Sequence, residues 1–156
     1  MATARPAVSI DAVLAASRGL VAVAARSLAA AGEEVTLPQY RMLVVLTTAG
    51  PQHLSALAEQ LSVAPSTATR MCDRLVRKGF LERVADPDDR RQVILRTTGS
   101  GAALVRAVMD RRRAEIAQLM AQLTPDEQHQ IVEALARLTA VAGEQGRAGE
   151  EVVWPL

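Results

Sequence analysis

Side chains suited to chemistry gather in one segment of this 156-residue chain, residues 65–78. Ala68, Met71, Cys72 and Leu75 recur there at helical spacing and should face a core. The residues left for the other directions are short hydroxyls first and mostly cations later: Ser66, Thr67, Thr69, Arg70, Asp73, Arg74 and Arg77. Short hydroxyls permit close approach to base edges, and arginine reaches guanine O6 and N7 or phosphates. On a lone helix such residues would form an ordinary solvated face. The neighbouring elements therefore decide between this interpretation and a DNA-binding face.

The charge distribution is more informative than the total charge. A net charge of +1 does not indicate nucleic-acid binding, because dedicated polyanion binders usually carry a clear basic excess. Residues 70–96, however, contain eight basic and five acidic side chains, so this segment is locally +3. The part of the chain after Val141 is acidic.

Short elements around this segment predict a helix-turn-helix followed by a hairpin. Residues 54–61 form a short helix that needs a partner, and the partner is the helix from Pro65 to Lys78, which stops at Gly79. Two short runs, 80–84 and 92–95, are rich in apolar or β-branched residues. A Pro-containing and Asp-containing turn separates them, which predicts a β-hairpin with a charged tip.

Longer helical patterns flank this motif. Apolar spacing predicts a helix over 9–31, and Thr36 with Pro38 begins a second helix that ends at Gly50. Thr98 precedes a long helix, and residues 124–127 open the last one. Aromatic residues are only 2% of the chain, which favours closely packed helices over a β-sandwich. We expect a mainly α fold with a small hairpin.

One stretch, residues 54–101, resembles the helix-turn-helix, recognition helix and wing of the MarR family of transcriptional regulators. The matching pieces are a Leu-rich first helix, a Ser/Thr-Arg helix, a Gly, an Asp-rich and Arg-rich wing, and a closing Thr-x-x-Gly: residues 54–61, 65–78, Gly79, 86–91 and 98–101. The resemblance implies a winged helix-turn-helix over 35–97, flanked by dimerisation helices over 1–34 and 98–156. The apolar ending, residues 152–156, is left open between a loose end, its own subunit and a partner.

The resemblance also implies roles for named residues. Ser66, Thr67, Thr69 and Arg70 would enter the major groove. Arg91 at the wing tip would enter the minor groove, with Asp89 holding its guanidinium, unless the two form an ordinary exposed ion pair. Phosphates would be held by Arg74, Arg77 and Arg90. The implied function is a homodimeric regulator of transcription, expected to be a repressor, on a pseudo-palindromic operator. The resemblance also suggests release by a small molecule, but few polar or aromatic groups mark a pocket, so the alternatives of an apolar effector and of no effector both stay open.

Other residue types place bounds on chemistry and compartment. The single cysteine, Cys72, excludes an intramolecular disulfide and a Cys-only zinc site. His53 and His129 begin no metal-ligand spacing, so solvent-facing or hydrogen-bonded histidines are expected, and neither a cofactor nor a metal is predicted. By this reading no apolar run approaches bilayer-spanning length, and the chain start lacks signal-peptide features. We therefore expect a cytoplasmic protein without a membrane partner.

Three other functions compete with a DNA-binding regulator. An enzyme lacks support because there is no phosphate-binding glycine loop, nucleophile elbow or metal spacing. A winged-helix module that binds another protein is the main alternative, because fold alone does not fix function. Single-stranded RNA binding is disfavoured because only Tyr40, Phe80 and Trp154 offer stacking surfaces. The operator sequence and the regulated genes cannot be read from the sequence.

Overall fold

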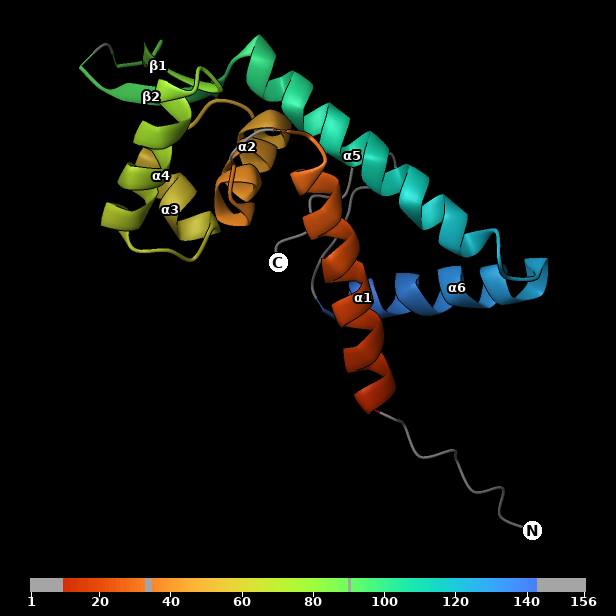
Figure 1. Ribbon diagram of the computed structural model, residues 1–156. Helices are drawn as coiled ribbons and strands as arrows, with labels where there is room; N and C mark the ends of the chain where they lie inside the picture. Colours follow the sequence, from red (N-terminus) through yellow and green to blue (C-terminus); the bar gives the residue numbers. More distant parts are fainter. Residues whose placement is uncertain (1–9, 33–34, 90, 143–156) are drawn as a thin grey trace.

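The computed structural model describes residues 10–32, 35–89 and 91–142. It is mostly helical with one two-stranded antiparallel hairpin, as the sequence predicts (Figure 1). The predicted apolar ending, residues 152–156, lies outside the described residues. The elements in chain order are α1 Ile10–Ala29, α2 Leu37–Ala49, α3 Leu54–Gln60, α4 Pro65–Arg77, β1 Leu81–Ala85, β2 Val93–Thr97, α5 Gly99–Met120 and α6 Pro125–Val141.

Helix starts follow local side-chain chemistry, as predicted. The Thr36 hydroxyl accepts a hydrogen bond from the Gln39 backbone N–H, and the Gln39 side chain accepts from the Thr36 N–H. Thr124 and Glu127 form the same reciprocal pair at the start of α6. Each capping box satisfies two backbone N–H groups that the helix itself leaves unpaired.

A dense core lies between α2, α3, α4, the hairpin and the first half of α5. Its largest buried side chains include Met42, Leu43, Leu57, Leu75 and Leu81, each no more than 2% exposed. In α4 the buried residues are the four that the helical spacing selected, Ala68, Met71, Cys72 and Leu75. We call residues 35–97, which contribute most of this core, the winged lobe.

The hairpin pairs Leu81 with Thr97 and Ala85 with Val93. Its strands start one residue later than the predicted 80–84 and 92–95, and β2 extends to Thr97. Phe80 is excluded from β1 because its backbone N–H donates to the Leu75 carbonyl at 2.9 Å, closing the end of α4. Gln52 forms an isolated antiparallel bridge with Leu95, so a residue before α3 extends the sheet.

A close junction connects the winged lobe to α5. The Thr98 N–H donates to the Phe80 carbonyl at 3.0 Å, and its hydroxyl donates to the Gly79 carbonyl at 2.6 Å. A Cβ on Gly101 would lie 2.2 Å from the Phe80 carbonyl oxygen, a distance that real Cβ atoms do not reach. Only glycine therefore allows the first turn of α5 to approach the end of α4 this closely.

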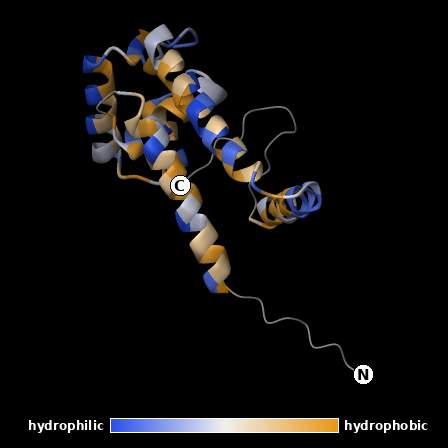
Figure 2. Cartoon of the chain, turned by 45° about the vertical axis from the view of Figure 1, so that its right-hand side comes forward, coloured by the Kyte–Doolittle hydropathy of each residue, from blue (hydrophilic) through white to orange (hydrophobic). Residues whose placement is uncertain are grey.

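The outer helices leave apolar faces uncovered. α5 leads away from the wing, and α6 turns back beside it (Figure 1). None of the residues of α6 is buried, and even its large apolar side chains Val132, Leu135 and Leu138 are between 43% and 59% exposed. In α1 the buried residues are Val23, Ala24, Ser27 and Leu28, all in its second half. Apolar colouring is correspondingly visible on the surface of α1 and α6 (Figure 2).

Helix α1 corrects the expectation that no apolar run approaches bilayer-spanning length. Its 20 residues include an 18-residue window of mean hydropathy 1.4, long and apolar enough to cross a membrane by length and composition. The expectation was wrong because alanines, interspersed with single charges such as Arg18, keep the mean hydropathy high without a continuous bulky run. These are weak grounds for a membrane span, and α1 contacts α5 in this structure.

Candidate nucleic-acid interface

The exposed face of α4 carries most of the predicted contact residues. Pro65 occupies the first helical turn, and the four buried apolar residues fix which way the helix is turned. Ser66, Thr67, Arg70, Arg74 and Arg77 are all exposed on the surface that this orientation leaves to solvent. The face therefore offers hydroxyls near the start of the helix and guanidinium groups toward its end.

Thr69 differs from the other residues predicted to read bases. Its side chain is half-buried, and its hydroxyl donates a hydrogen bond to the Pro65 carbonyl at 2.9 Å. This bond uses the only hydrogen of the hydroxyl, so Thr69 keeps acceptor capacity but no free donor in this conformation. Thr69 is therefore suited to accept from a base amino group or to contact a thymine methyl.

An ion pair joins α4 to the wing. Arg83 on β1 places Nη2 2.5 Å from Asp73 Oδ1 on α4, and both side chains are nearly half exposed. The same nitrogen lies 3.6 Å from the buried Cys72 Sγ. Burial raises the pKa of the Cys72 thiol above its ordinary value, although the nearby Arg83 charge opposes this. Cys72 thus packs as a small apolar group, and Arg83 ties the first wing strand to α4.

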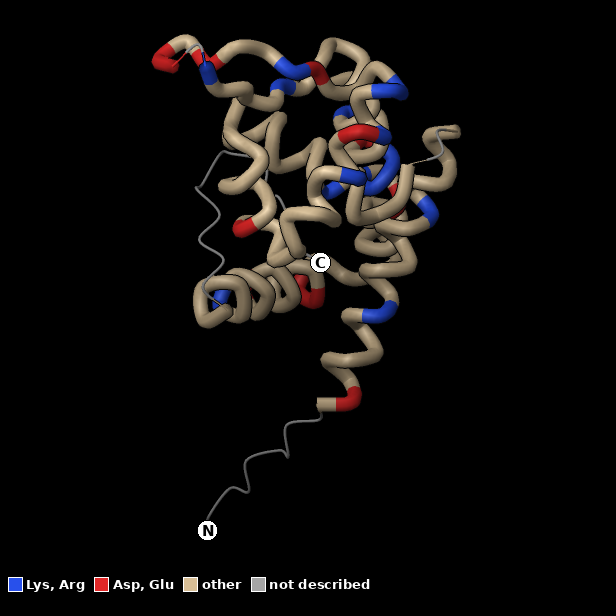
Figure 3. Tube along the Cα trace, turned by 90° about the vertical axis from the view of Figure 1, so that its left-hand side faces the viewer, with Lys and Arg blue, Asp and Glu red and all other residues tan. Residues whose placement is uncertain are grey.

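The wing turn is ordered by two aspartates. Asp86 Oδ1 accepts the Asp88 backbone N–H at 2.8 Å, and Asp89 Oδ1 accepts the Arg91 backbone N–H at 3.1 Å. Asp89 Oδ2 also accepts from the Gln92 side chain at 3.1 Å. These bonds, led by that of Gln92, lower the pKa of the Asp89 carboxyl. Acidic and basic residues lie close together in this turn (Figure 3).

The expected pairing of Asp89 with the Arg91 guanidinium is not present in this structure. Asp89 binds the Arg91 backbone instead, because a side chain reaches an N–H two residues on within a tight turn without ordering a long side chain. Arg91 is exposed at the wing tip. Arg90, predicted to hold a phosphate, lies outside the described residues.

Three further residues anchor the wing and were not selected from the sequence. The backbone of Gln52 exchanges two hydrogen bonds with Leu95, of 3.2 and 2.9 Å. His53 Nε2 lies 2.9 Å from Asp86 Oδ2, and Arg83 binds Asp73 as described above. Both histidines are side-chain partners of carboxylates, since His129 lies 3.8 Å from Glu133 on α6. In the described part of the chain, no three His, Cys, Asp or Glu residues gather as metal ligands would.

A hollow lies where α1, α2 and α5 meet. It is a small, partly open hollow of about 30 Å³. Its walls are mainly apolar, with one phenol and two guanidinium groups among them: Ala24, Leu37, Tyr40, Arg41, Val44, Val108 and Arg112. The Tyr40 hydroxyl is 3.5 Å from the Val105 carbonyl oxygen. The hollow is therefore apolar with cationic groups in its lining.

Together, a helix-turn-helix, a hairpin packed behind its second helix and exposed cations on both define a winged helix-turn-helix protein. The model of the MarR family matches residues 35–93. The solved structure of RV1404 from Mycobacterium tuberculosis superposes with a TM-score of 0.84 at 43% identity, covering 92% of this chain and 100% of that one. The apo form of Escherichia coli MarR has a TM-score of 0.71 at 26% identity, covering 86% and 98%.

Curated relatives agree with the structures. The transcriptional repressor MdtR of Bacillus subtilis is 33% identical over 69% of this chain and 70% of its own length. Several other relatives are matched over only 61–66% of their length. The chain belongs to the MarR family of transcriptional regulators, which are not enzymes.

Proposed function

We propose that this regulator represses transcription as a homodimer, by binding a pseudo-palindromic operator in double-stranded DNA. The observation that carries the proposal is the exposed face of α4, where Ser66, Thr67, Arg70 and Arg74 lie free of the core, next to a wing tip with Arg91 exposed. In this proposal α4 lies in the major groove and the wing follows the adjacent minor groove.

The three arginines have different roles. Arg70 lies in the first half of α4 and reads bases, Arg74 lies one turn further on and holds a phosphate, and Arg91 at the wing tip reads minor-groove shape. Arg77 and Arg90 add phosphate contacts. Asp89 acts by closing the turn behind Arg91, since its carboxylate accepts the Arg91 backbone N–H.

Dimerisation is supported by the uncovered apolar faces of the outer helices. Val132, Leu135 and Leu138 of α6 and Val13 and Leu14 of α1 are each at least 43% exposed within one chain. A soluble monomer rarely exposes so many large apolar side chains. Residues 1–34 and 98–156 accordingly form the dimerisation part and residues 35–97 the DNA-binding part, and two-fold symmetry sets half-sites about 10 base pairs apart.

The hollow between α1, α2 and α5 supports release by a small molecule. Its apolar walls and the cationic side chain of Arg112 fit a ligand with an apolar body and a negative group. A ligand there would touch both an outer helix and α2 of the winged lobe, so it could change the angle between them. In this proposal the regulator needs no cofactor and acts in the cytoplasm.

Selection of bound fragments from random DNA, followed by footprinting, tests the proposal. We expect enriched sites with a dyad and protection of both half-sites. Arg70→Ala should cost about 1 to 3 kcal/mol at particular operator positions, whereas Arg74→Ala should weaken all sequences alike and reduce the salt slope by about 1. Arg91→Ala should cost most on operators with A·T-rich flanks.

A winged-helix module that binds another protein would give a different result. Its affinity for a partner would change little with salt, whereas DNA affinity falls steeply with salt through counterion release. Failure to enrich any DNA sequence, together with weak salt dependence of residual DNA binding, would sink the proposal.

A further inference from the structure

Two arginines of the hairpin are paired with carboxylates in this structure. Arg96 on β2 donates from Nε and Nη2 to Glu82 Oε1, at 2.9 and 2.8 Å, and the two residues are directly opposite each other in the strand register. Arg83 on β1 reaches a different element, because its Nη2 lies 2.5 Å from Asp73 Oδ1 on α4. The first pair connects the two strands, whereas the second connects the wing to the helix that carries the proposed base contacts.

Arg83 lies where the core between β1 and α4 ends. Leu81, two residues earlier on β1, is 2% exposed and belongs to that core. Side chains two residues apart on a strand share a face, so Arg83 continues the core-facing row of β1. Its side chain is 44% exposed, and Nη2 lies 3.6 Å from the buried Cys72 Sγ. The pair with Asp73 therefore closes the solvent-facing edge of the contact between β1 and α4.

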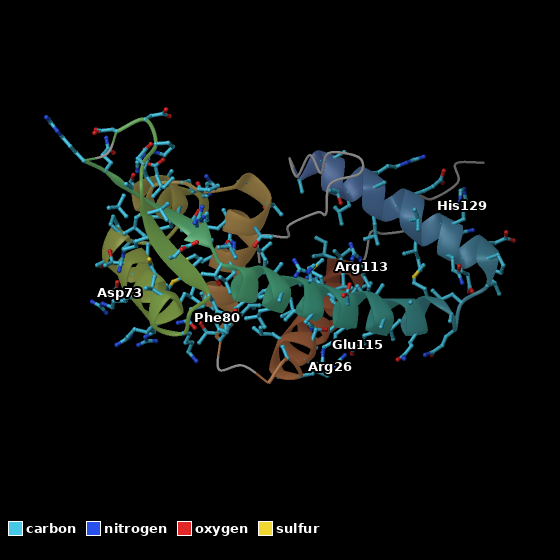
Figure 4. The ribbon with its side chains drawn as sticks, turned by 90° about the horizontal axis from the view of Figure 1, so that it is seen from above. Arg26, Asp73, Phe80, Arg113, Glu115 and His129 are labelled. Carbon is cyan, nitrogen blue, oxygen red and sulfur yellow. The ribbon has the colours of Figure 1, made fainter. Side chains whose placement is uncertain are left out.

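Asp73 is the only acidic residue of α4. It lies three residues after Arg70 and four before Arg77, positions from which a carboxylate can pair with either arginine along a helix. In this structure its carboxylate pairs with Arg83 on the wing. Asp73 lies in the same part of the molecule as the hairpin, away from α6 (Figure 4). A carboxylate on this helix repels DNA phosphates, so charge alone predicts tighter DNA binding when it is removed.

We propose that Asp73 and Arg83 are positioning residues for DNA binding, whose ion pair holds the wing, and with it Arg91, at a fixed place beside α4. This role rests on the proposed DNA-binding function, whereas the ion pair belongs to the free protein. A wing already held beside α4 loses less conformational freedom when both enter adjacent grooves. Loss of either partner therefore weakens DNA binding, even though loss of Asp73 makes the winged lobe more positive.

The first test measures the coupling of the two side chains in the free, full-length protein. Denaturant unfolding at one protein concentration is compared for Asp73→Asn, Arg83→Gln and the double variant. We expect the combined effect on the unfolding equilibrium constant to differ from the product of the single effects by about two- to fivefold, the size of a partly exposed ion pair.

The matched control combines Asp73→Asn with Arg96→Gln, because Arg96 is an arginine of the same hairpin whose partner is Glu82. These two changes should act independently. Independent effects of Asp73→Asn and Arg83→Gln, or an equal coupling in the control, would overturn the inference whether or not the protein binds DNA.

The second test measures affinity for the selected operator at several salt concentrations. Asp73→Asn should bind about two- to fivefold more weakly than the wild type. The control Glu82→Gln removes a carboxylate of similar exposure, 42% against 46%, and should bind at least as tightly as the wild type. Tighter binding by Asp73→Asn would mean that its charge only repels DNA. That result, or the same loss in Glu82→Gln, would overturn the positioning role.

Arg83→Gln separates positioning from direct contact with DNA. It should lose about the same two- to fivefold with an unchanged salt slope, since removing a phosphate contact would reduce the slope by about 1. The double variant should bind no more weakly than either single variant. In the Arg91→Ala background neither change should cost more, because the wing tip no longer contributes to binding.

Three results would each contradict the positioning role: a reduced salt slope in Arg83→Gln, wild-type affinity in the double variant, and an undiminished loss in the Arg91→Ala background. Wild-type affinity in the double variant would mean that Arg83 only neutralises Asp73. Absence of any DNA binding by the wild type contradicts the proposed function and the DNA role of the pair, while the unfolding measurements still decide whether the ion pair couples the wing to α4.

Discussion

The winged lobe and the outer helices solve the problem of burial in different ways. In the lobe, short elements bury each other, so that α3, with only seven residues, contributes the fully buried Leu57. In contrast, the 17-residue α6 buries none of its residues. The lobe therefore buries most of its apolar side chains, with the help of the first half of α5, whereas α6 and the first half of α1 leave large apolar side chains exposed in a single chain.

The difference teaches where stability and assembly lie in this molecule. Loss of a lobe side chain should unfold the chain at any protein concentration. Loss of an outer-helix side chain should act through association, and its effect on apparent stability should depend on concentration. The predictions below test this division, beginning with the largest expected effect.

Placing charges on the uncovered face of α6 should dissociate the dimer. In the variant Leu135→Glu with Leu138→Glu, two side chains worth about 1.5 to 3 kcal/mol each on burial are replaced by charges that an apolar interface cannot solvate. Light scattering should give the mass of one chain, with the helical content of the lobe retained. The control Gln130→Glu with Arg137→Glu changes the opposite face of α6 and should stay dimeric. If the variant with Leu135→Glu and Leu138→Glu stays dimeric, the interface lies elsewhere.

Truncating the lobe core should unfold the chain. Leu57→Ala should lower the free energy of unfolding by about 2 to 5 kcal/mol, because Leu57 is fully buried between short helices that cannot collapse onto the cavity. Denaturant unfolding at several protein concentrations should give the same loss at each. Leu138→Ala is the matched change on α6, and its effect should vary with concentration. Equal, concentration-independent losses for the two variants would contradict the division.

The junction between the winged lobe and α5 should not tolerate a Cβ at position 101. Gly101→Ala places a Cβ 2.2 Å from the Phe80 carbonyl oxygen and 2.8 Å from the Thr97 methyl, so the start of α5 must shift. We expect a loss of about 1 to 3 kcal/mol in unfolding free energy, by analogy with overpacked cores. Gly99→Ala is the control, because nothing lies within 4 Å of a Cβ there. A neutral Gly101→Ala would show that the junction is loose.

The smallest predicted effect is acid sensitivity at the start of α6. Hydrogen bonds from the backbone N–H and the hydroxyl of Thr124 lower the pKa of the Glu127 carboxyl. A carboxyl with a depressed pKa contributes stability above its ordinary pKa, and this contribution disappears as pH falls through the lowered value. Helical content followed by circular dichroism below pH 5 should therefore fall slightly less steeply in Glu127→Gln, which keeps the cap without the charge. Identical acid profiles would mean that the cap contributes nothing.

Local patterns predicted most of the elements, because their causes lie within a few residues. Thr36, Thr98 and Thr124 begin helices in the structure as the sequence suggested, and the buried face of α4 follows from helical spacing alone. The strands were displaced by one residue because the Phe80 N–H is taken by Leu75, a bond that apolar content does not reveal.

The side-chain pairs that orient the wing could not be predicted in the same way. His53 and Asp86 are separated by 33 positions and meet only once the hairpin has folded beside the residues that precede α3. In this structure Asp89 accepts the Arg91 backbone N–H, a local bond between residues two apart, and its pairing with the Arg91 guanidinium on DNA stays a prediction. The contact residues on α4 remain predictions, and their exposure is consistent with the proposed role.

The close approach of Gly101 to Phe80 means that α5 and the winged lobe move together as one body. The helix has 22 residues and is therefore about 33 Å long. Its first turn is packed tightly against the winged lobe at Gly101. At that length, a turn of only about 5° about the far end of the helix moves the near end by about 3 Å, close to the rise of one base pair. In the proposed dimer, small changes in the angle between the outer helices would thus be enough to change the separation of the two winged lobes by about the rise of one base pair.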